Sequence, residues 1–267
     1  MVRAAVAGIG GRMGSRIAQL IAGTHGIELT GSFEYPQHPA VGKDIAEITG
    51  GSPTGRIVCN DIEHVLASSD VVIDFTNASA SVDHLRKAAP TGTSMVIGST
   101  GFSPGQLAEA RELARSIPCV LTPNMSVGVN VMFKIVAETA RLLSEGYDVE
   151  IIEAHHRFKK DAPSGTALKL AEIVAEALGR DLERDGVFAR HGIVGERTGR
   201  EIGVQTIRAG DIVGEHTVLF GGLGERIEIT HKAHSRDNFV RGAIRAAMWV
   251  VNQPPGLYDM QDVMALR

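Results

Sequence analysis

The chain has 267 residues, of which 43% are hydrophobic and 22% charged, so it suits an ordinary globular protein of one large or two modest domains. Its formal net charge of -4 at pH 7 argues against a general binder of nucleic acid or membrane surfaces. The two cysteines, Cys59 and Cys119, form neither a metal-type spacing nor a disulfide framework, and the sequence shows no signal-peptide pattern or bilayer-length apolar run. We therefore expect a cytoplasmic protein with no metal, nucleic-acid or membrane partner.

Strand-like and helix-like segments alternate over the first 125 residues or so. Strands are predicted over 2–7, 26–34, 70–76, 94–101 and 118–124, and helices over 15–23, 79–89 and 103–116. The uninterrupted apolar core of such segments as 70–76 is typical of strands that are buried on both faces. Alternation of this kind predicts right-handed βαβ crossovers and a Rossmann-type, doubly wound parallel sheet.

The pattern changes after residue 124. Helices are predicted over 127–146, 164–179 and 236–253, and a strand over 148–154. Residues 190–234 are β-rich, with glycine turns at hairpin-like spacing, and a short tail follows the last helix. Because no flexible linker separates the two patterns, we expect two packed domains, the second of α+β type.

Glycines cluster at the first predicted strand-to-helix turn, at Gly8, Gly10, Gly11 and Gly14. Glycine there permits a tight turn and lets the backbone approach a pyrophosphate, which the helix N-terminus then binds. The spacing departs from G-x-G-x-x-G because Met13 stands at the third glycine position. Glu34 ends the second strand, where an acid accepts hydrogen bonds from the adenosine ribose. A plain glycine turn and a surface glutamate explain each feature singly, whereas together they predict dinucleotide binding.

The residues around Glu34 bear on which dinucleotide binds. Its charge would repel the 2′-phosphate of NADPH, and no arginine occurs in the Tyr-Pro-Gln-His segment at 35–38. We therefore expect NADH to be favoured over NADPH, while Arg12 and Lys43 leave NADPH open.

Three later strand ends are rich in small polar residues, namely FTN at 75–77, GST at 98–100 and TPNM at 122–125. The carboxyl ends of strands in a doubly wound sheet face the cofactor crevice. We therefore expect these segments to contact the nicotinamide side of the cofactor, with ordinary turn chemistry as the alternative.

The segment EAHHRFKKDAPSGTA at 153–167 lies between a predicted strand and a predicted helix. Free N–H groups at the start of that helix, from Ser164 to Thr166, form an anion site with the helix dipole. Gly165 lets a ligand oxygen come close. Histidine and lysine side chains in the preceding loop add separated donors, which suit a dicarboxylate better than a phosphate.

Two residues of this segment, His155 and Lys159, are also proton donors of the kind that a reduction needs after hydride delivery. A solvated basic loop is the simpler interpretation of any single cation, and we keep it for Arg157 and Lys160. The combination of paired histidines, a spaced lysine and an anion-binding helix start favours a catalytic site.

Residues 153–167 resemble the signature of the 4-hydroxy-tetrahydrodipicolinate reductase family, also called dihydrodipicolinate reductases, of bacterial and plant lysine synthesis. The family pattern is approximately E-x-H-H-x-x-K-x-D-x-x-S-G-T-A, and Glu153 through Ala167 match it throughout. The resemblance extends along the chain, to GxGGRMG at 8–14, DFT at 74–76, VIGSTGF at 96–102, NMSVGVNV at 124–131, RAGDIVGEHTV at 208–218 and GERIEITHKAHSR at 224–236.

The resemblance implies a dinucleotide-binding domain over 1–126, completed by 237–267, and a substrate-binding and tetramerisation domain with a mixed sheet over 127–236. It implies NAD(P)H-dependent reduction of 4-hydroxy-tetrahydrodipicolinate, through its dehydrated form, to tetrahydrodipicolinate in lysine and diaminopimelate biosynthesis. The ligand would thus be a small cyclic dicarboxylate, and the assembly a homotetramer.

The resemblance also implies roles for individual residues. His155 would be the acid/base residue and Lys159 a proton donor. The substrate carboxylates would be held by His156, Lys159, Gly165 and Thr166. The cofactor would be lined by Gly8, Ile9, Gly10, Gly11, Arg12, Met13, Glu34, Gly98, Ser99, Thr100, Thr122, Pro123, Asn124 and Met125. Tyr35 and Asn77 stand where some relatives carry arginine, which again favours NADH.

Two other functions are compatible with the first half of the chain. One is a different two-domain oxidoreductase, such as an aspartate or sugar dehydrogenase, and the other is a non-catalytic redox sensor that binds NAD(H). Residues 153–167 argue against both, because neither needs a histidine–lysine pair beside a dicarboxylate site.

Overall fold

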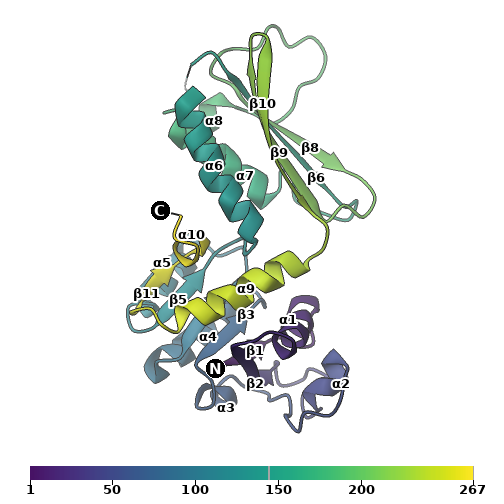
Figure 1. Cartoon of the computed structure of the whole chain (residues 1–267), viewed down its shortest axis with the longest axis vertical. Coiled ribbons are helices and arrows are strands. Elements are labelled where there is room, and N and C mark those ends of the chain that lie inside the picture. Colours follow the sequence, from purple (N-terminus) through teal and green to yellow (C-terminus); the bar gives the residue numbers. More distant parts are fainter. Residues whose placement is uncertain (144, 267) are drawn as a thin grey trace. The chain divides into compact units, whose positions relative to one another are not determined.

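The computed structural model describes residues 1–143 and 145–266. The chain divides into two compact units (Figure 1). Unit 1 combines Met1–Val127 with Asp237–Arg267, and unit 2 comprises Gly128–Arg236. Which ligand each unit binds remains a prediction at this stage. The predicted helix over 127–146 and the tail each include one residue, 144 and 267 respectively, that lies outside the described residues.

Unit 1 contains a six-stranded parallel sheet in the order β11-β5-β4-β3-β1-β2. Its strands are β1 (Val2–Ala7), β2 (Ile27–Phe33), β3 (Val71–Asp74), β4 (Ser94–Ile97), β5 (Pro118–Leu121) and β11 (Gly256–Tyr258). Every residue of β3 and β4 is buried, as the apolar runs predicted. The Rossmann-type parallel sheet that the alternating pattern predicted is therefore confirmed.

Helices cover both faces of this sheet, because alternate strand residues point to opposite sides. On one side Ala4 and Val6 pack in a cluster with α1 (Arg12–Ala22) and α9 (Asp237–Val250). On the other side Ala5 and Ala7 pack with α3 (Glu63–Leu66), α4 (Ala78–Ala88) and α5 (Pro104–Leu113). The remaining short elements are α2 (Ile45–Thr49), the 3-10 helix η1 (Ala89–Thr91) and α10 (Met260–Val263).

The C-terminal segment returns to unit 1 and completes it. Arg16 of α1 forms a bidentate ion pair with Asp237 of α9, with Nε–Oδ1 and Nη2–Oδ2 distances of 2.8 and 2.7 Å. Residues Gly256–Tyr258, predicted only as tail, form the edge strand β11 beside β5. A strand of three residues is too short to show an alternating hydrophobic pattern in the sequence. It is defined only by its pairing with β5.

The predicted strands also end earlier than the sequence indicated. β3, β4 and β5 stop at Asp74, Ile97 and Leu121, whereas strands were predicted to 76, 101 and 124. The polar residues that follow form loops at the carboxyl edge of the sheet. One of them, Asn77, caps α4, since its Oδ1 accepts a hydrogen bond from Ala80 N at 3.0 Å.

Unit 2 contains a mixed five-stranded sheet in the order β10-β9-β6-β8-β7. Its strands are β6 (Asp148–His155), β7 (Gly186–Val187), β8 (Ile202–Arg208), β9 (Gly214–Gly222) and β10 (Glu225–Ala233). β8 pairs parallel to β6 and β7, whereas β9 pairs antiparallel to β6 and β10. The predicted α+β domain with a mixed sheet is thus confirmed.

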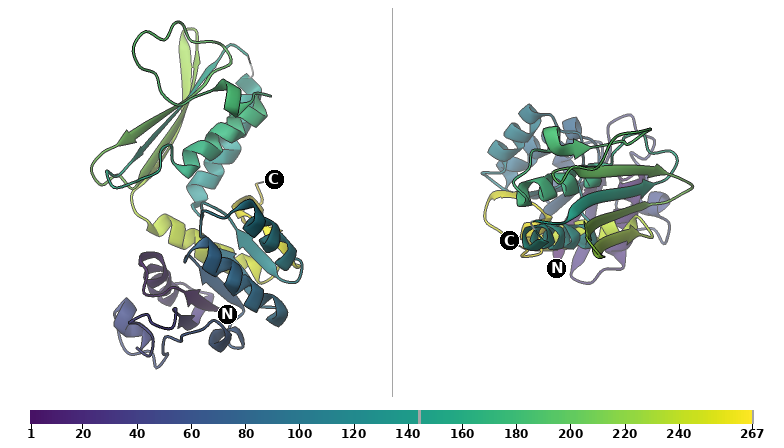
Figure 2. Two further views of the ribbon diagram at one scale, coloured as in Figure 1. Left: turned by 180° about the vertical axis from the view of Figure 1, so that it is seen from behind. Right: turned by 90° about the horizontal axis from the view of Figure 1, so that it is seen from above.

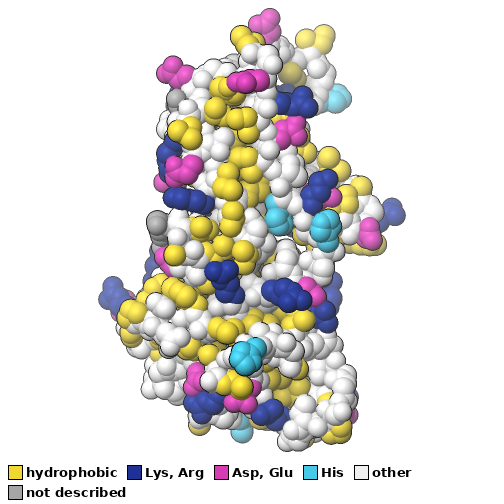
Figure 3. All heavy atoms as spheres, in the orientation of Figure 1, with side chains coloured by type: hydrophobic (Ala, Val, Ile, Leu, Met, Phe, Trp, Pro, Cys, Tyr) yellow, Lys and Arg dark blue, Asp and Glu magenta, His cyan; other side chains and the backbone are white. Residues whose placement is uncertain are grey.

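The helices of unit 2, namely α6 (Val127–Leu143), α7 (Gly165–Ala177) and the short α8 (Leu182–Asp185), lie on one face of this sheet (Figure 2). Val149 and Ile151 of β6 pack there against α6 and α7. Figure 3 shows a band of hydrophobic side chains over α6 as well. None of the helices that the structure describes is both long and apolar enough to cross a membrane.

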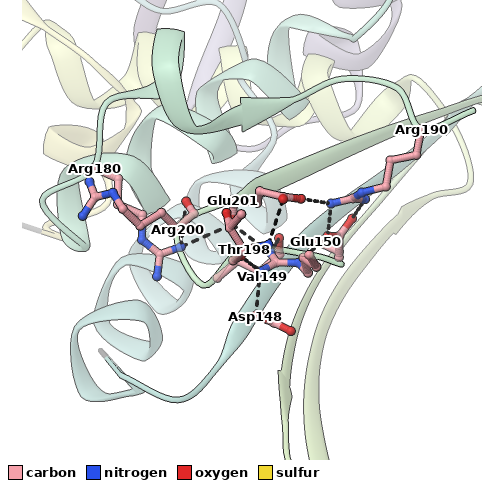
Figure 4. A network of polar contacts seen from close by, with 9 residues as sticks. Asp148, Val149, Glu150, Arg180, Arg190, Thr198, Arg200 and Glu201 are labelled. Carbon is pink, nitrogen blue, oxygen red and sulfur yellow. Dashed lines mark hydrogen bonds and ion pairs between the residues drawn. The ribbon is translucent and has the colours of Figure 1, made fainter. Parts of the chain in front are cut away.

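The opposite, outer face of the sheet is partly crossed by the loop 188–201, which an ion-pair network attaches to β6 (Figure 4). Arg190 donates from Nη1 and Nη2 to the two carboxylate oxygens of Glu150, both at 2.9 Å. Arg197 adds a 3.2 Å bond from Nε to Glu150 Oε1. Glu150 is therefore held by two arginines on the face away from the helices.

A close backbone approach in unit 1 predicts which glycine is required for packing. A Cβ on Gly242 of α9 would lie 1.8 Å from the carbonyl oxygen of Met125, whereas a Cβ on Gly105 of α5 would have no neighbour nearer than 3.9 Å. We expect Gly242→Ala to lower the free energy of unfolding by about 1–3 kcal/mol through overpacking. The control Gly105→Ala should change it little or raise it by up to about 1 kcal/mol. Equilibrium urea unfolding of both variants measures this, and equal stabilities would contradict the close approach.

Candidate active site

The glycine turn of unit 1 lies between β1 and α1, as predicted. Gly8 has a φ of +67°, in the left-handed region that glycine adopts without strain. A Cβ on Gly14 would lie 2.1 Å from the carbonyl oxygen of Gly8. Gly14 therefore provides the close helix–strand packing for which dinucleotide-binding turns use their third glycine, one position later than the common spacing.

Glu34 joins the second strand to this turn. The residue is buried, and its Oε1 accepts a hydrogen bond from Gly10 N at 2.8 Å. Beside it lies a cavity of about 500 Å³, whose lining includes Gly8, Glu34, Tyr35 and Thr76. That volume is within the usual range of small-ligand sites. The glycine turn, the acid and the cavity thus come together at the carboxyl edge of the sheet.

The other predicted cofactor residues lie at the same edge, but they differ in what they expose. The side chains of Ile9 and Met125 are in the core, so only their main-chain atoms can face a ligand. Ser99 is buried against Ser81, with 2.8 Å between their hydroxyl oxygens. Arg12, Thr100 and Pro123 are exposed, and Gly11 is too. Met13, Gly98, Thr122 and Asn124 are buried or half-buried.

A buried pair that the sequence analysis did not assign orders one of these loops. Asp74 at the end of β3 accepts hydrogen bonds at Oδ1 from the N and Oγ1 of Thr76, at 2.8 and 2.6 Å. Its Oδ2 lies 2.7 Å from Nδ1 of His84 in α4. The Asp-Phe-Thr motif was visible in the sequence, whereas its histidine partner ten residues on was not.

The predicted anion site of unit 2 is the first turn of α7. Ser164 is the N-cap, and its Oγ accepts a hydrogen bond from Ala167 N at 3.2 Å. Gly165 is exposed, and a Cβ there would meet no atom within 4 Å. Thr166 is half-buried next to it. The helix start is therefore open to a ligand, with the helix dipole favouring an anion.

Glu153 lies at the centre of the polar cluster behind this turn, with a fully buried side chain. Its Oε2 is 2.6 Å from His155 Nδ1, and its Oε1 accepts from Ser164 N at 3.0 Å. Arg208 donates to both oxygens, each at 2.8 Å. Burial favours the neutral acid, but the donors from Arg208, His155 and Ser164 outweigh it and lower the pKa of Glu153 to about 2.

The predicted proton donors are His155, the last residue of β6, and Lys159, in the loop that follows β6. The side chain of His155 is 11% exposed, and burial lowers its pKa although Glu153 acts in the opposite direction. Nζ of Lys159 lies 2.8 Å from Oδ2 of Asp161, and the lysine contributes to lowering the pKa of His155. His156 is half-buried, whereas Lys160 is exposed.

His216 of β9 is a second residue that sequence reasoning missed. Its Nε2 is 3.0 Å from Ser164 Oγ, and its ring centroid is 5.2 Å from that of His155. Burial, followed by the nearby His155, lowers the pKa of His216 to about 3. The position was visible only as part of a matching motif, because its proximity to Ser164 depends on the pairing of β9 with β6.

Among residues 1–143 and 145–266, no three or more His, Cys, Asp or Glu side chains are grouped so as to hold a metal ion. The acidic and imidazole groups described above are instead bound to protein donors and acceptors. This arrangement brings the predicted proton donors and the predicted anion site to the same turn of unit 2.

Comparison with known proteins identifies the family. Residues 2–125 match the model of the dihydrodipicolinate reductase N-terminus, and residues 128–264 match that of the C-terminus. The chain is 67% identical over 267 residues to 4-hydroxy-tetrahydrodipicolinate reductase of Syntrophobacter fumaroxidans, and 57% identical to that of Syntrophus aciditrophicus. Both alignments cover 100% of each chain.

Solved structures agree with this result. The fold is similar to that of a dipicolinate-bound dihydrodipicolinate reductase from Paenisporosarcina sp. TG-14, with a TM-score of 0.77, 26% identity and 98% of each chain covered. An amine dehydrogenase from Mycobacterium smegmatis matches with a TM-score of 0.61 and 17% identity, covering 96% of this chain and 94% of its own. The second likeness shows a shared fold.

The enzymes of this family use NADH or NADPH. The chain belongs to the dihydrodipicolinate reductase family, and its activity is the reduction of 4-hydroxy-tetrahydrodipicolinate in lysine and diaminopimelate biosynthesis.

Proposed function

We propose that unit 2 performs the acid/base part of this reduction at the turn between β6 and α7. His155 is the acid/base residue and Lys159 a further proton donor. The carboxylates of the cyclic substrate bind at His156, Lys159, Gly165 and Thr166. The observation that carries the proposal is that a carboxylate-held imidazole and an open helix start share one turn of the chain.

A small dicarboxylate suits this turn for reasons of charge and spacing. The exposed backbone at Gly165 offers an N–H group at the positive end of α7, and the cations of the preceding loop, such as Lys159, are separate donors earlier in the chain. A ligand with two separated carboxylates can bind the N–H group and a cation at once, whereas a compact anion can bind only one of them. The solved relative with 26% identity is described as dipicolinate-bound, and dipicolinate is a ligand of this class.

The residues of the turn divide the chemistry between them. The bound nicotinamide cofactor supplies the hydride, and the protein supplies the proton that completes the reduction. Because Nδ1 of His155 is engaged by Glu153, Nε2 is the nitrogen from which this imidazole can donate. The ionised Glu153 stabilises the protonated ring, while burial makes that ring a stronger acid than histidine in water.

We propose that unit 1 binds the cofactor at the glycine turn and that it prefers NADH. The turn and strand-end residues named from the family resemblance line that site, with Glu34 toward the adenosine ribose. Two cations, Arg86 and Lys87, also line the cavity beside Glu34. Each is already paired with two acids, Arg86 with Asp83 and Glu109, and Lys87 with Asp61 and Glu63. A 2′-phosphate would have to compete with these carboxylates for both cations.

We also propose that the chain forms a homotetramer in the cytoplasm through the outer face of the unit 2 sheet. By strand register, Ile152, Ile207 and Leu219 share that face, and Ile207 is 47% exposed. None of the described helices of unit 2 packs there, so a second copy of the sheet is the natural cover. Both cysteines are free thiols, as a reducing compartment requires.

Substitution of the two proposed proton donors tests the acid/base site. We expect His155→Gln and Lys159→Met each to lower kcat/KM by on the order of 10²-fold or more, the usual contribution of general acid/base catalysis. NADH affinity should be unchanged, because the cofactor site lies in unit 1. Steady-state kinetics with substrate made in situ, together with NADH fluorescence titration, measure both quantities. The adjacent Lys160→Met is the matched control, and wild-type turnover in His155→Gln would contradict the assignment.

Cofactor preference is tested at Tyr35, which is 59% exposed beside Glu34. The wild type should show a higher kcat/KM with NADH than with NADPH. Tyr35→Arg should tighten NADPH by roughly tenfold, or ~1.4 kcal/mol, because it adds a cation to the lining of the cavity beside Glu34. Tyr35→Gln controls for loss of the ring, and tighter binding of NADPH than NADH by the wild type would refute the preference.

The assembly is tested by sedimentation velocity. The wild type should sediment as a tetramer, and Ile207→Glu should shift it to smaller species by placing a charge in an apolar contact. Leu142→Glu, at an 83% exposed position on α6, introduces the same charge away from the outer face and should leave the tetramer intact. A monomeric wild type at micromolar concentration would rule the proposal out.

A further inference from the structure

We propose that Glu153 is a positioning residue for the reduction, a single carboxylate that holds the imidazole of His155, the first turn of α7 and the Lys159 loop in one arrangement. The inference rests on the proposed acid/base role of His155. Glu153 itself is fully buried and therefore does not contact substrate.

Strand geometry places Glu153 where it reaches both His155 and α7. Residues two apart in a strand point to the same face, so Glu153 and His155 lie side by side on the helix-covered face of β6. One oxygen, Oε2, lies 2.6 Å from His155 Nδ1, and the other, Oε1, accepts from Ser164 N at 3.0 Å. The carboxylate thus fixes the orientation of the imidazole relative to the proposed anion site.

Arg208 extends this arrangement to the loop that carries Lys159. Its Nη1 and Nη2 bind the two oxygens of Glu153, and Nη2 also donates to the carbonyl oxygen of Asp161 at 2.6 Å. Asp161 in turn binds Lys159 through its side chain. Each of the three parts of the proposed site is therefore attached, directly or through Arg208, to the same carboxylate.

The position of His155 Nε2 supports a catalytic purpose for this arrangement. With Nδ1 held by Glu153, the free edge of the ring is directed toward β9 at Gly214, where a Cβ would lie 3.1 Å from Nε2. Any larger residue at Gly214 would crowd the nitrogen that must exchange a proton. The absence of a side chain at Gly214, which is itself buried, leaves space beside this nitrogen.

Several charged or titratable groups face His155 from the neighbouring elements. Glu153 lies on its own strand, Arg208 on β8, His216 on β9, and Lys159 in the following loop. On β10, His231 lies opposite His216 and not His155. Among these groups Glu153 favours the protonated imidazole, whereas Lys159 and Arg208 disfavour it. His216 stays neutral near pH 7, because burial lowers its pKa to about 3.

A purely structural ion pair would hold the fold together without acting on His155, and the chain contains a matched example. Glu150, on the same strand, is bound by Nη1 and Nη2 of Arg190 and by Nε of Arg197, yet it lies on the outer face, and neither arginine belongs to the proposed site (Figure 4). Glu153→Gln and Glu150→Gln therefore remove the same charge from the same strand. Glu153→Gln removes it next to the imidazole, and Glu150→Gln removes it on the opposite face.

The test is the pH dependence of kcat/KM, which reports the free enzyme. If protonated His155 is the acid, kcat/KM falls as pH rises through the pKa of His155. This descending part of the pH profile, the alkaline limb, should be absent in His155→Gln. Glu153→Gln removes the group that favours protonation, so its limb should move to lower pH, with kcat/KM lowered by on the order of 10²-fold and NADH affinity unchanged. Arg208→Gln removes a disfavouring charge and should move the limb to higher pH. Glu150→Gln should leave the limb in place.

Opposite shifts in Glu153→Gln and Arg208→Gln would establish the positioning role. Unmoved limbs in both variants, or a loss in Glu150→Gln as large as in Glu153→Gln, would overturn it. Should Glu153→Gln fail to fold, the direction of the shift in Arg208→Gln decides alone. A limb that persists in His155→Gln would instead remove the acid/base assignment on which the inference rests, so the two failures are distinguishable.

Discussion

The buried carboxylate of Glu153 is the constraint on which the proposed acid/base site of unit 2 depends. A charge with no exposure is tolerated only when every oxygen is bound, and five donors from β6, β8 and the start of α7 supply those bonds. To provide them, β8 must pair parallel with β6 so that Thr206 and Arg208 face Glu153 and His155. The parallel pairing of β8 with β6 and the turn into α7 together bring these donors to one side chain.

An ion pair of this kind is a weak source of stability, because desolvation offsets most of the attraction between the charges. We infer that its role is to specify the arrangement of the elements around it. Leu170 and Val174 of α7 pack on the sheet through apolar contacts, which are less directional than hydrogen bonds. The hydrogen bond from Ser164 N to Glu153 is directional, and it fixes where the helix begins relative to His155. Packing holds α7 on the sheet, and the carboxylate sets its register.

The sequence predicted those features that depend on local pattern. Apolar runs gave the parallel strands, Gly8 and Gly14 marked the first turn, and Ser-Gly-Thr at 164–166 marked an anion-binding helix start. It did not reveal β11, which exists only by pairing with β5, nor the contact of His216 with Ser164, which depends on strand register. Glu153 was recognised only as the first residue of the family motif, and its role was not predicted. An acid within an apolar strand does not indicate which donors will surround it.

Two buried acids, Glu34 after β2 and Glu153 within β6, show how the number of protein donors separates a proposed ligand-binding group from a proposed positioning group. Glu34 and Glu153 are both buried, and each accepts a hydrogen bond from a backbone N–H group at a strand-to-helix turn. The donor is Gly10 N for Glu34 and Ser164 N for Glu153. A carboxylate can accept about four hydrogen bonds. Glu153 receives five donors from the protein and has no capacity left for a ligand, whereas the backbone of Gly10 uses one oxygen of Glu34 beside an open cavity. In the proposed sites, the same chemical group therefore serves recognition where the protein leaves it acceptor capacity, and positioning where the protein uses that capacity completely.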